Sequence, residues 1–573
     1  MPRRCWEHLR GLSNQADSKK DGVHYMGVSI HLAISHSVTR EEWADVYEET
    51  LQLVKRFPLA ERREVPVRGI PTMCLVRTKE REYQRGWTRE EFARGWFADG
   101  DYERVRTAEE YFLPRDLVSK DQYDRDAPDA LLESALDYLG GYDRNDSRFY
   151  RNYSLWGAKT QGEPYHMYLL AIACLIESRL GQKAYVYGDI TKGQCERAVR
   201  MANEHLDRAI HAPDRCDKDR LLNRINDIPL SETEKLELFT GMYLGREDAE
   251  FGKTVREHFS EQACDEYWGR RFHLYQVTMV GFDNALADYL LWGFDLERMC
   301  LFISFQDEKG DTHYEQFIRK VMDTKLHHRE KDCTDLLKTD PDDEEPYGIE
   351  TLFAQLVFMG ARNKKVDRYI PIDKIRLALS RAIGNLCPVD EIIDEYLQEE
   401  DAQEPIDLSG GKSDEDCEKA AKQDPSGVMN EMLKTASQVY KMQDEKYDIW
   451  RPEDLPYYEA GDSVHPNLVK ALGMTFEFYR SFLGEDTYLD LMKQNPVERC
   501  KWLARKNRWV LLRDKDWERI YDDIMENSES FARYYPMMRV KAINEGLSDL
   551  PGAFAINDDL YSYALGLASD VSE

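Results

Sequence analysis

Residues 159–189 read KTQGEPYHMYLLAIACLIESRLGQKAYVYGD and hold the most clearly predicted buried helix and buried strand of the chain, one directly after the other. Pro164 stands where the first turn of a helix tolerates proline, and Gly181 is a typical helix stop. Between them lies a wide apolar face made of Tyr168, Leu169, Ala171, Ile172, Leu175 and Ile176. The β-prone run 184–187 follows, and the stretch therefore predicts a helix, then a strand that ends at an acid, Asp189.

The polar residues around this helix and strand are the candidate site residues. In open α/β sheets, ligands bind at the carboxyl ends of strands, which makes Asp189 a candidate. His166 lies near the start of the predicted helix, where the helix dipole lowers the pKa of an imidazole and favours a neutral base. His31, on the first predicted strand, would join the same cleft if the two strands were neighbours. Lys159 and Gln161 are the candidates for holding an anion.

These residues define a hypothetical polar cleft in which His166, Asp189 and His31 are catalytic and the substrate is small and anionic or nucleotide-like. The same residues also fit an ordinary loop, helix cap and turn, because no nucleophile at a diagnostic spacing accompanies them. The sequence leaves open whether the protein is an enzyme.

The N-terminal part has the pattern of a small α/β unit. Apolar and polar residues alternate over 28–35, which is the period of a half-buried strand. Thr39 and Glu42 form a capping box that opens a helix over 40–56. Two β-prone runs follow and are separated by Pro71. Between 87 and 126 no period is sustained, and no structure is predicted there.

A chain of 573 residues exceeds what one hydrophobic core normally serves, so several domains are expected. The predicted fold class is predominantly α, with a small α/β portion containing a mixed sheet in the N-terminal third. The predicted organisation is a polar, disordered tail over 1–25, the small α/β unit over 26–126, a helix-rich domain over 127–331 whose strand 184–188 packs on the N-terminal sheet, an acidic connection over 332–348, short helices over 349–399, a flexible acidic linker or loop over 400–427, and a C-terminal helical domain over 428–573.

The composition indicates that the protein is folded and strongly acidic. Hydrophobic residues make up 42% of the chain, which excludes wholesale disorder, and the net charge is −30. Such a field repels nucleic acid and anionic lipid and favours a basic protein partner, although acidity also serves solubility alone. No apolar stretch has the length that a bilayer requires, and no apolar leader follows the basic N-terminus. We expect no membrane association and no direct binding of nucleic acid.

The eleven cysteines are spread singly, and no CxxC pair occurs. This pattern matches neither a disulfide framework nor a zinc ribbon and indicates reduced thiols in a cytoplasm. Cys195, His205, His211 and Cys216 lie close in sequence but at spacings that fit no standard zinc site. The GGKS sequence that begins at Gly410 has isoleucine where a phosphate-binding loop requires glycine. No metal and no cofactor are therefore expected.

Aromatic residues and prolines are concentrated in the stretch WRPEDLPYYEAGDSVHP, residues 450–466. Trp450, Tyr457 and Tyr458 are candidate partner-binding residues, because aromatic side chains supply contact area at low entropic cost. Packing of this loop on its own domain is the alternative. Exposure of these rings in the fold distinguishes the two.

The leading functional hypothesis is an intracellular acidic protein that engages a basic macromolecular partner, as an inhibitor, an immunity-like factor or an assembly subunit would. The alternative is an enzyme with the polar cleft around His166 and Asp189. Partner binding requires an exposed apolar or aromatic patch rimmed by acids. Catalysis requires a concave pocket in which the candidate side chains converge.

Overall fold

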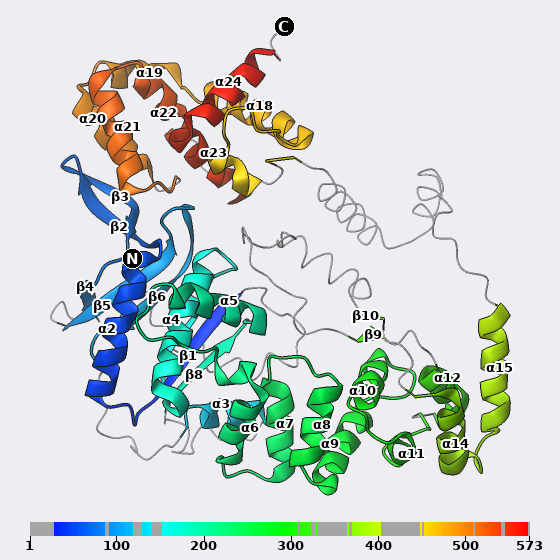
Figure 1. The fold of residues 1–573 in the computed structure, drawn as a ribbon. Coiled ribbons are helices and arrows are strands. Elements are labelled where there is room, and N and C mark those ends of the chain that lie inside the picture. The colour runs from blue at the N-terminus through cyan, green and yellow to red at the C-terminus, as the bar shows by residue number, and fades with distance from the viewer. Residues whose placement is uncertain are drawn as a thin grey trace.

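The protein is mainly helical, with small antiparallel sheets in its N-terminal region, in a computed structural model (Figure 1). This confirms the predicted helix-dominated fold class with a small sheet portion. The structure describes residues 28–85, 91–117, 129–139, 152–307, 309–322, 327–328, 364–365, 370–402, 447–449, 452–507, 510–539 and 545–570. The predicted tail 1–25, the acidic connection 332–348, residues 349–363 and 403–427, and Gly410 with the GGKS sequence lie outside these ranges.

The first sheet has three strands, and the central one is β1 (Ser29–Ser35). Strand β7 (Asn152–Lys159) pairs with one side of β1 and β8 (Ala184–Gly188) with the other, both antiparallel. The side chains of Ile30, Leu32 and Ile34 are fully buried in a core that they share with the following helices. The predicted neighbours β1 and β8 are thus paired, but β8 is an edge strand and runs opposite to β1.

Helix α4 (Tyr165–Leu180) is the most deeply buried element of this core. It contacts α2 (Arg40–Arg56), α5 (Lys192–Asn203) and the first sheet, so residues all round it are buried rather than those of one face. It ends at Gly181, whose φ of 57° is a conformation that favours glycine. The capping box predicted for α2 is present: the Thr39 hydroxyl accepts the Glu42 N–H, and the Glu42 carboxylate accepts the Thr39 N–H. Helix α5 has the equivalent box, formed by Thr191 and Gln194.

The second sheet contains strands that the sequence did not predict. Its order is β3-β2-β5-β4, with β6 also paired to β5, and every pairing is antiparallel. Strand β5 carries glycines where β6 approaches closely: a Cβ at Gly95 would lie 2.3 Å from the Leu113 carbonyl oxygen, and one at Gly100 would lie 2.4 Å from that of Arg106. Because glycine is unfavourable inside strands, the sequence of β5 does not have the pattern that predicts a strand. The bounds are β2 (Leu59–Val67), β3 (Ile70–Arg77), β4 (Arg81–Arg85), β5 (Glu91–Asp101) and β6 (Arg106–Pro114).

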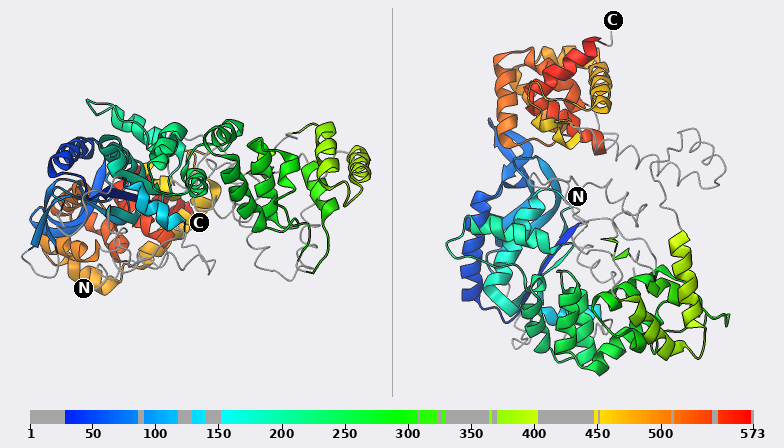
Figure 2. Two further views of the ribbon diagram at one scale, coloured as in Figure 1. Left: turned by 90° about the horizontal axis from the view of Figure 1, so that it is seen from below. Right: turned by 45° about the vertical axis from the view of Figure 1, so that its right-hand side comes forward.

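The helices that follow extend in a row away from the sheets and share a second core, rich in aromatic residues such as Trp268 and Trp292 (Figures 1 and 2). A capping box formed by Ser231 and Glu234 opens one of them. Their bounds are α3 (Leu131–Tyr138), η3 (Asp214–Cys216), α6 (Lys218–Asn226), α7 (Glu232–Met242), α8 (Ala249–His258), α9 (Glu261–His273), α10 (Val280–Leu291), α11 (Leu296–Met299), α12 (Tyr314–Met322), α14 (Ile372–Ile383) and α15 (Val389–Ala402), with two-residue strands at His327–His328 and Lys364–Lys365.

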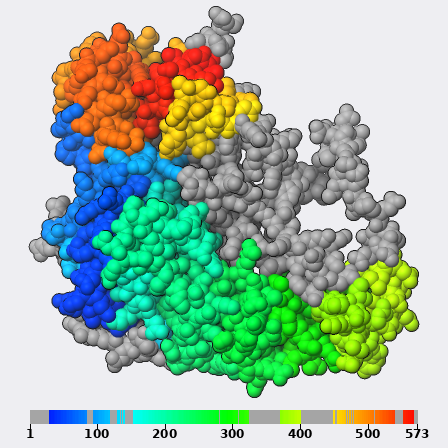
Figure 3. Space-filling view, viewed as in Figure 1, coloured from blue at the N-terminus to red at the C-terminus, as the bar shows by residue number. Residues whose placement is uncertain are grey.

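The C-terminal helices form a third core together with the β2–β3 hairpin, which extends toward them (Figure 1), and the surfaces of the two parts adjoin in the space-filling view (Figure 3). The Thr72 and Tyr521 hydroxyls are 2.8 Å apart, and the Leu75 N–H donates to the Leu512 carbonyl oxygen at 2.9 Å. Buried contacts therefore join the β2–β3 hairpin of the N-terminal region to the C-terminal helices. The bounds are η5 (Pro452–Tyr457), α18 (Pro466–Ser481), α19 (Glu485–Met492), α20 (Pro496–Lys506), α21 (Asp514–Glu526), α22 (Ser530–Arg539), α23 (Glu545–Ile556) and α24 (Asp558–Asp570).

Candidate functional site

Asp189 and His31 are linked through Ser29. The Asp189 carboxylate accepts the Ser29 N–H at 2.9 Å and the Ser29 hydroxyl at 2.8 Å. The Ser29 Oγ also lies 3.2 Å from His31 Nε2. Because the hydroxyl gives its one hydrogen to Asp189, His31 Nε2 has to be the donor in the second contact. The three side chains form one hydrogen-bonded chain on one face of the first sheet.

This chain lies at the amino end of β1 because β1 and β8 are antiparallel. Gly188 pairs with Ile30, which places Asp189 beside Ser29. The rule that ligands bind at carboxyl ends of strands concerns parallel sheets and does not apply to this arrangement. Asp189 itself is exposed. The geometry therefore brings together two of the three predicted catalytic residues, through a pairing different from the one expected.

Two glycines give the His31 ring its place on the sheet. A Cβ at Gly157 would lie 3.4 Å from the ring and one at Gly188 would lie 3.0 Å from it, and the ring stacks on Tyr187 at 4.8 Å. Burial lowers the pKa of His31, and the Asp189 carboxylate partly opposes this shift. His31 is thus a neutral imidazole with Nε2 protonated at neutral pH. In that state it does not withdraw the Ser29 proton, so Ser29 is not an activated nucleophile.

His166 lies behind the same sheet. Its Nδ1 is 2.7 Å from the Thr160 hydroxyl, which donates to the Val28 carbonyl oxygen at 3.1 Å. Val28 and Thr160 precede and follow the Ser29–Lys159 pair, so their side chains point to the face opposite His31. His166 is fully buried, and no third residue connects it to Asp189 among the described contacts. The single cleft predicted for His166, His31 and Asp189 is therefore divided by the sheet.

The protonation of His166 follows from its partners. Thr160 uses its hydrogen on Val28, so Nδ1 of His166 carries a proton and Nε2 is an acceptor. Within the described part of the chain, Nε2 is buried and has no hydrogen-bond partner. Burial lowers the pKa of His166 to about 3, and the nearby Arg197 guanidinium adds to the shift. Burial, rather than the helix dipole expected from sequence, is the main cause.

The two candidate anion-binding residues are placed differently. Lys159 is paired with Ser29 in register and stands on the face that carries His31, while its N–H donates to Glu109 at 2.9 Å. Gln161 has a φ of 55°, and its N–H donates to the Val28 carbonyl oxygen at 3.1 Å. Gln161 thus belongs to the turn that leads into α4, and Lys159 is the one on the face of Asp189.

A basic pocket begins two residues after Asp189. It has a volume of about 770 Å³ and lies between the start of α5, the start of α6 and the segment that opens α8. We call it the α5–α8 pocket. Its cationic side chains are Lys192, Arg197, Arg200, Lys218 and Arg246, and its carboxylates are Glu196, Asp248 and Glu250. Sequence reasoning missed this pocket, because its cations are separated along the chain and only the fold brings them together.

Several of the charged groups in the pocket are already engaged. Asp248 caps α8 by accepting from the N–H groups of Glu250 and Phe251, both at 3.0 Å. Lys218 donates to the Thr254 hydroxyl at 3.0 Å, and Lys192 lies 3.8 Å from Glu196. Among the described contacts, neither exposed arginine of the pocket, Arg200 or Arg246, takes part in an ion pair.

The aromatic residues of the α5–α8 pocket are sealed against each other. Tyr243 and Phe251 stack with ring centroids 5.2 Å apart, and their exposed fractions are 8% and 2%. Their faces are not free for a ligand ring. The surface that a ligand meets is therefore mostly charged and polar.

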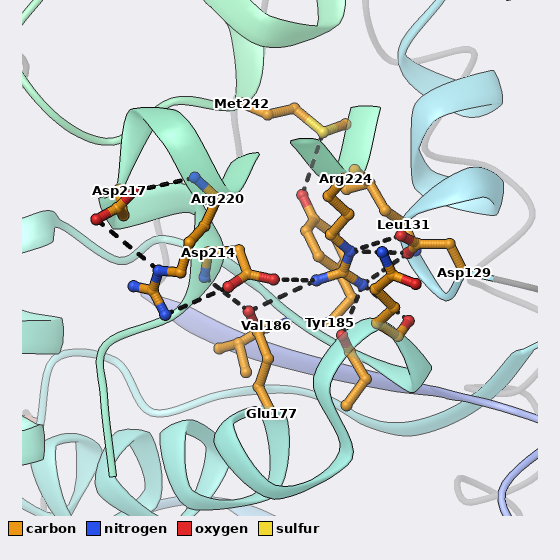
Figure 4. Close-up of polar contacts among 12 residues, drawn as sticks. Asp129, Leu131, Glu177, Tyr185, Val186, Asp214, Asp217, Arg220, Arg224 and Met242 are labelled. Atoms are coloured by element: carbon orange, nitrogen blue, oxygen red, sulfur yellow. Dashed lines mark hydrogen bonds and ion pairs between the residues drawn. The ribbon is translucent and has the colours of Figure 1, made fainter. Parts of the chain in front are cut away.

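A buried ionic cluster around Arg224 lies between β8 and α6, the helix whose start lines the α5–α8 pocket (Figure 4). Arg224 on α6 donates through Nε to both Asp129 oxygens at 2.8 Å and through Nη2 to the Ala184 carbonyl oxygen at 2.7 Å. Its Nη1 lies 3.2 Å from Asp214 and 3.7 Å from Glu177. The cluster fixes α6 against β8 and α4, and so holds one wall of the pocket relative to the sheet.

The aromatic loop offers less surface than its composition indicates. Tyr458 is 7% exposed and stacks on Tyr563 at 5.2 Å in the C-terminal core. Tyr457 is 47% exposed. Trp450 lies outside the described residues. Of the three candidate partner-binding residues, Tyr457 is the one that the structure shows with an open side chain.

Two of the four residues considered for zinc lie together. Cys195 contacts both Cys174 and Cys216 through its sulfur, and all three thiols are buried. His205 lies instead against Phe57, and His211 contacts Arg220. In the described ranges, no group of three or more His, Cys, Asp or Glu side chains is arranged to hold a metal ion.

Comparison with known proteins gives no match: no family model, no curated protein and no solved structure resembles the chain. Of the helices that the structure describes, none is both long enough and apolar enough to cross a membrane.

Proposed function

We propose that the protein binds a small, hydrophilic polyanion, such as a phosphorylated metabolite, in the α5–α8 pocket. The observation that carries the proposal is the gathering of five cationic side chains around a cavity of about 770 Å³ in a protein whose net charge is −30. These five cations outnumber the three carboxylates of the lining, and a concave site with an excess of one sign of charge focuses the potential and raises the local concentration of the opposite ion.

The start of α5 contributes donors as well as charge. Thr191 accepts the N–H of Gln194, which leaves the N–H groups of Lys192 and Gly193 without a partner inside the helix. The positive end of the helix dipole points the same way. Phosphate groups bind at helix N-termini for these reasons.

The absence of an open aromatic face in the described lining selects against ligands with a large ring. Tyr243 and Phe251 cover each other, so a nucleobase would find no stacking partner on them. A ligand rich in hydroxyl and phosphate groups matches the lining better.

The ligand could be a substrate, and His31 with Asp189 would then supply the proton transfer. This proposal is supported by the hydrogen-bonded chain of His31, Ser29 and Asp189, which ends two residues before the lining of the pocket. His166 would take no part in this step, because it is fully buried behind the sheet, on the face opposite His31.

Binding can be measured by titration calorimetry at low salt with inorganic phosphate and a sugar phosphate. We expect Arg200→Gln and Arg246→Gln each to weaken binding about tenfold or more, because a charge-assisted hydrogen bond is lost. Arg505→Gln, an equal charge change on α20, should leave binding unchanged. The proposal fails if the folded wild-type protein binds neither anion, or if Arg505→Gln weakens binding as much as the pocket variants do.

A second candidate function is the engagement of a basic protein partner through α15. This helix exposes Asp390, Glu391, Asp394, Glu395 and Glu399. Arg376 pairs with Asp390 and Asp394, whereas Glu391 and Glu395 form no ion pair within the described contacts. Helix α14, which packs against α15, carries Leu377 with 53% of its side chain exposed. A surface with unpaired acids on one helix and an exposed apolar residue on its neighbour fits a basic, partly apolar partner.

The second candidate predicts a charge-specific interaction. A Glu391→Lys, Glu395→Lys double variant should lose a partner that the wild-type protein retains from extracts of its source cells. A double variant with the same charge change at Glu485 and Asp559, in the C-terminal helices, should retain it. If both double variants retain the same partners, α15 is not the binding surface.

A further inference from the structure

We infer that the ligand of the α5–α8 pocket carries two separated phosphate groups joined by a hydroxyl-bearing backbone, as a sugar or polyol bisphosphate does. This inference rests on the proposed function and names the class of anion that the pocket selects.

The cavity is larger than a single phosphate requires. Its volume of about 770 Å³ falls within the range of roughly 300–1,000 Å³ that is typical of metabolite and cofactor sites. One phosphate ion would fill a small part of this space and leave the remainder to water. The pocket is built for a larger molecule.

The cationic side chains of the pocket are spread along its wall and are not gathered at one point. Lys192 and Arg200 both line the pocket from α5 and are eight residues apart, which corresponds to roughly 12 Å along the helix axis. Arg197 lies between them, and Lys218 and Arg246 come from other segments. A single phosphate cannot contact both ends of such a row. Two phosphates held apart can.

Carboxylates stand among the cations of the pocket. Glu196 lies on α5 between Lys192 and Arg200 and lines the same pocket, as Glu250 does from α8. A condensed phosphate chain would bring negative charge against Glu196 along its whole length. Hydroxyl groups are donors as well as acceptors and can give hydrogen bonds to carboxylates. Along α5, Lys192 and Arg200 would each contact one phosphate group, and Glu196 between them would accept hydrogen bonds from the hydroxyl groups that join the two phosphates.

The test compares ligands in titration calorimetry on the full chain: a hexose bisphosphate, its two monophosphates and inorganic tripolyphosphate. We expect the bisphosphate to bind at least about 30-fold more tightly than either monophosphate, since the second phosphate adds charge-assisted hydrogen bonds of its own. We also expect it to bind more tightly than tripolyphosphate.

Variants at the two ends of the row separate the phosphate positions. Lys192→Gln and Arg200→Gln should each reduce the affinity for the bisphosphate to nearly that for a monophosphate. Each should also weaken mainly one of the two monophosphates. Glu196→Gln should raise the affinity for tripolyphosphate, because the repulsion is removed. Thermal melts of each variant establish that it is folded.

The outcomes distinguish this inference from the proposed function. If a monophosphate or tripolyphosphate binds as tightly as the bisphosphate, the inference is overturned while anion binding in the pocket stands. If none of these anions binds to the folded wild-type protein, both are overturned.

Discussion

The Arg224 guanidinium and the Asp129 carboxylate form an ion pair at 2.7 Å with both side chains almost fully buried, 2% and 5% exposed. The pair joins α6 to the start of α3, and Arg224 also binds the end of the loop before β8 through the Gln182 and Ala184 carbonyl oxygens. Removal of Asp129 leaves the buried Arg224 guanidinium with only Asp214 and Glu177 to offset its charge, which costs more than loss of an exposed pair.

Asp129→Asn is therefore expected to lower the free energy of unfolding by about 3 kcal/mol or more. Asp390→Asn, which removes the exposed partner of Arg376, should cost less than about 1 kcal/mol. Chemical denaturation of the two variants measures the difference. Equal losses of stability would show that the Arg224 cluster does not hold this part of the fold.

Glu177 predicts a dependence of stability on pH. It accepts the N–H groups of Val186 at 2.7 Å and Asp214 at 2.9 Å, and burial raises its pKa to about 7. Its pKa in the unfolded chain is about 4.3, so the folded state binds the proton more tightly. The stabilisation is fully present below the unfolded pKa and is lost as the pH rises through 7. The loss attributable to Glu177 is about 4 kcal/mol across this window.

The comparison that isolates this effect is Glu177→Gln. The variant is less stable at every pH, because its NH2 group replaces one of the two carboxyl oxygens and cannot accept the N–H that this oxygen binds. Its stability relative to wild type should nevertheless improve between pH 5 and pH 8, because only the wild type loses the protonated carboxyl. Denaturant titrations at the two pH values measure this; a constant difference would exclude Glu177 as the titrating group.

Local sequence signals predicted the helices well because helix ends depend on neighbouring residues. The capping box at Thr39 and the glycine at Gly181 mark the observed ends of their helices. Strand β5 was missed because Gly95 and Gly100 are required by the close approach of β6, a contact that is not local. The direction of β8 relative to β1 was equally beyond local reasoning.

The candidate site was predicted in part for the same reason. His31 and Asp189 could be proposed as neighbours because two strands were recognisable, and their link through Ser29 appears only with the antiparallel register. His166 was recognised as a neutral histidine but placed on the wrong side of the sheet. The cations of the α5–α8 pocket carry no sequence signal, since Lys192 and Arg246 meet only after several elements have packed.

The three thiols at the junction of α4, α5 and η3 should be inert in the folded protein. Cys174, Cys195 and Cys216 are buried, and the pKa of each thiol is raised above its usual value. Burial is the main cause for Cys174, whereas hydrogen bonding to Cys174 and to Cys195 is the main cause for Cys195 and Cys216, respectively. Among the eight cysteines that the structure describes, alkylation at pH 8 followed by peptide mass spectrometry should show the partly exposed Cys300 and Cys387 modified first. The trio should react only after denaturant is added. Modification of Cys195 in the native protein would contradict the packing of α5 against α4.

His31 offers a direct test of the hydrogen-bonded chain on the first sheet. The Asp189 carboxylate raises the pKa of His31 against the lowering caused by burial, so Asp189→Asn should lower that pKa further. The pKa falls because a negative charge within hydrogen-bonding reach of Ser29 is removed. Titration of the His31 ring by NMR measures it, and Asp207→Asn, on an exposed loop after α5, serves as the control. A pKa that rises or stays fixed in Asp189→Asn would mean that His31 and Asp189 are not electrostatically coupled, and the proposed role of this pair in proton transfer would be withdrawn.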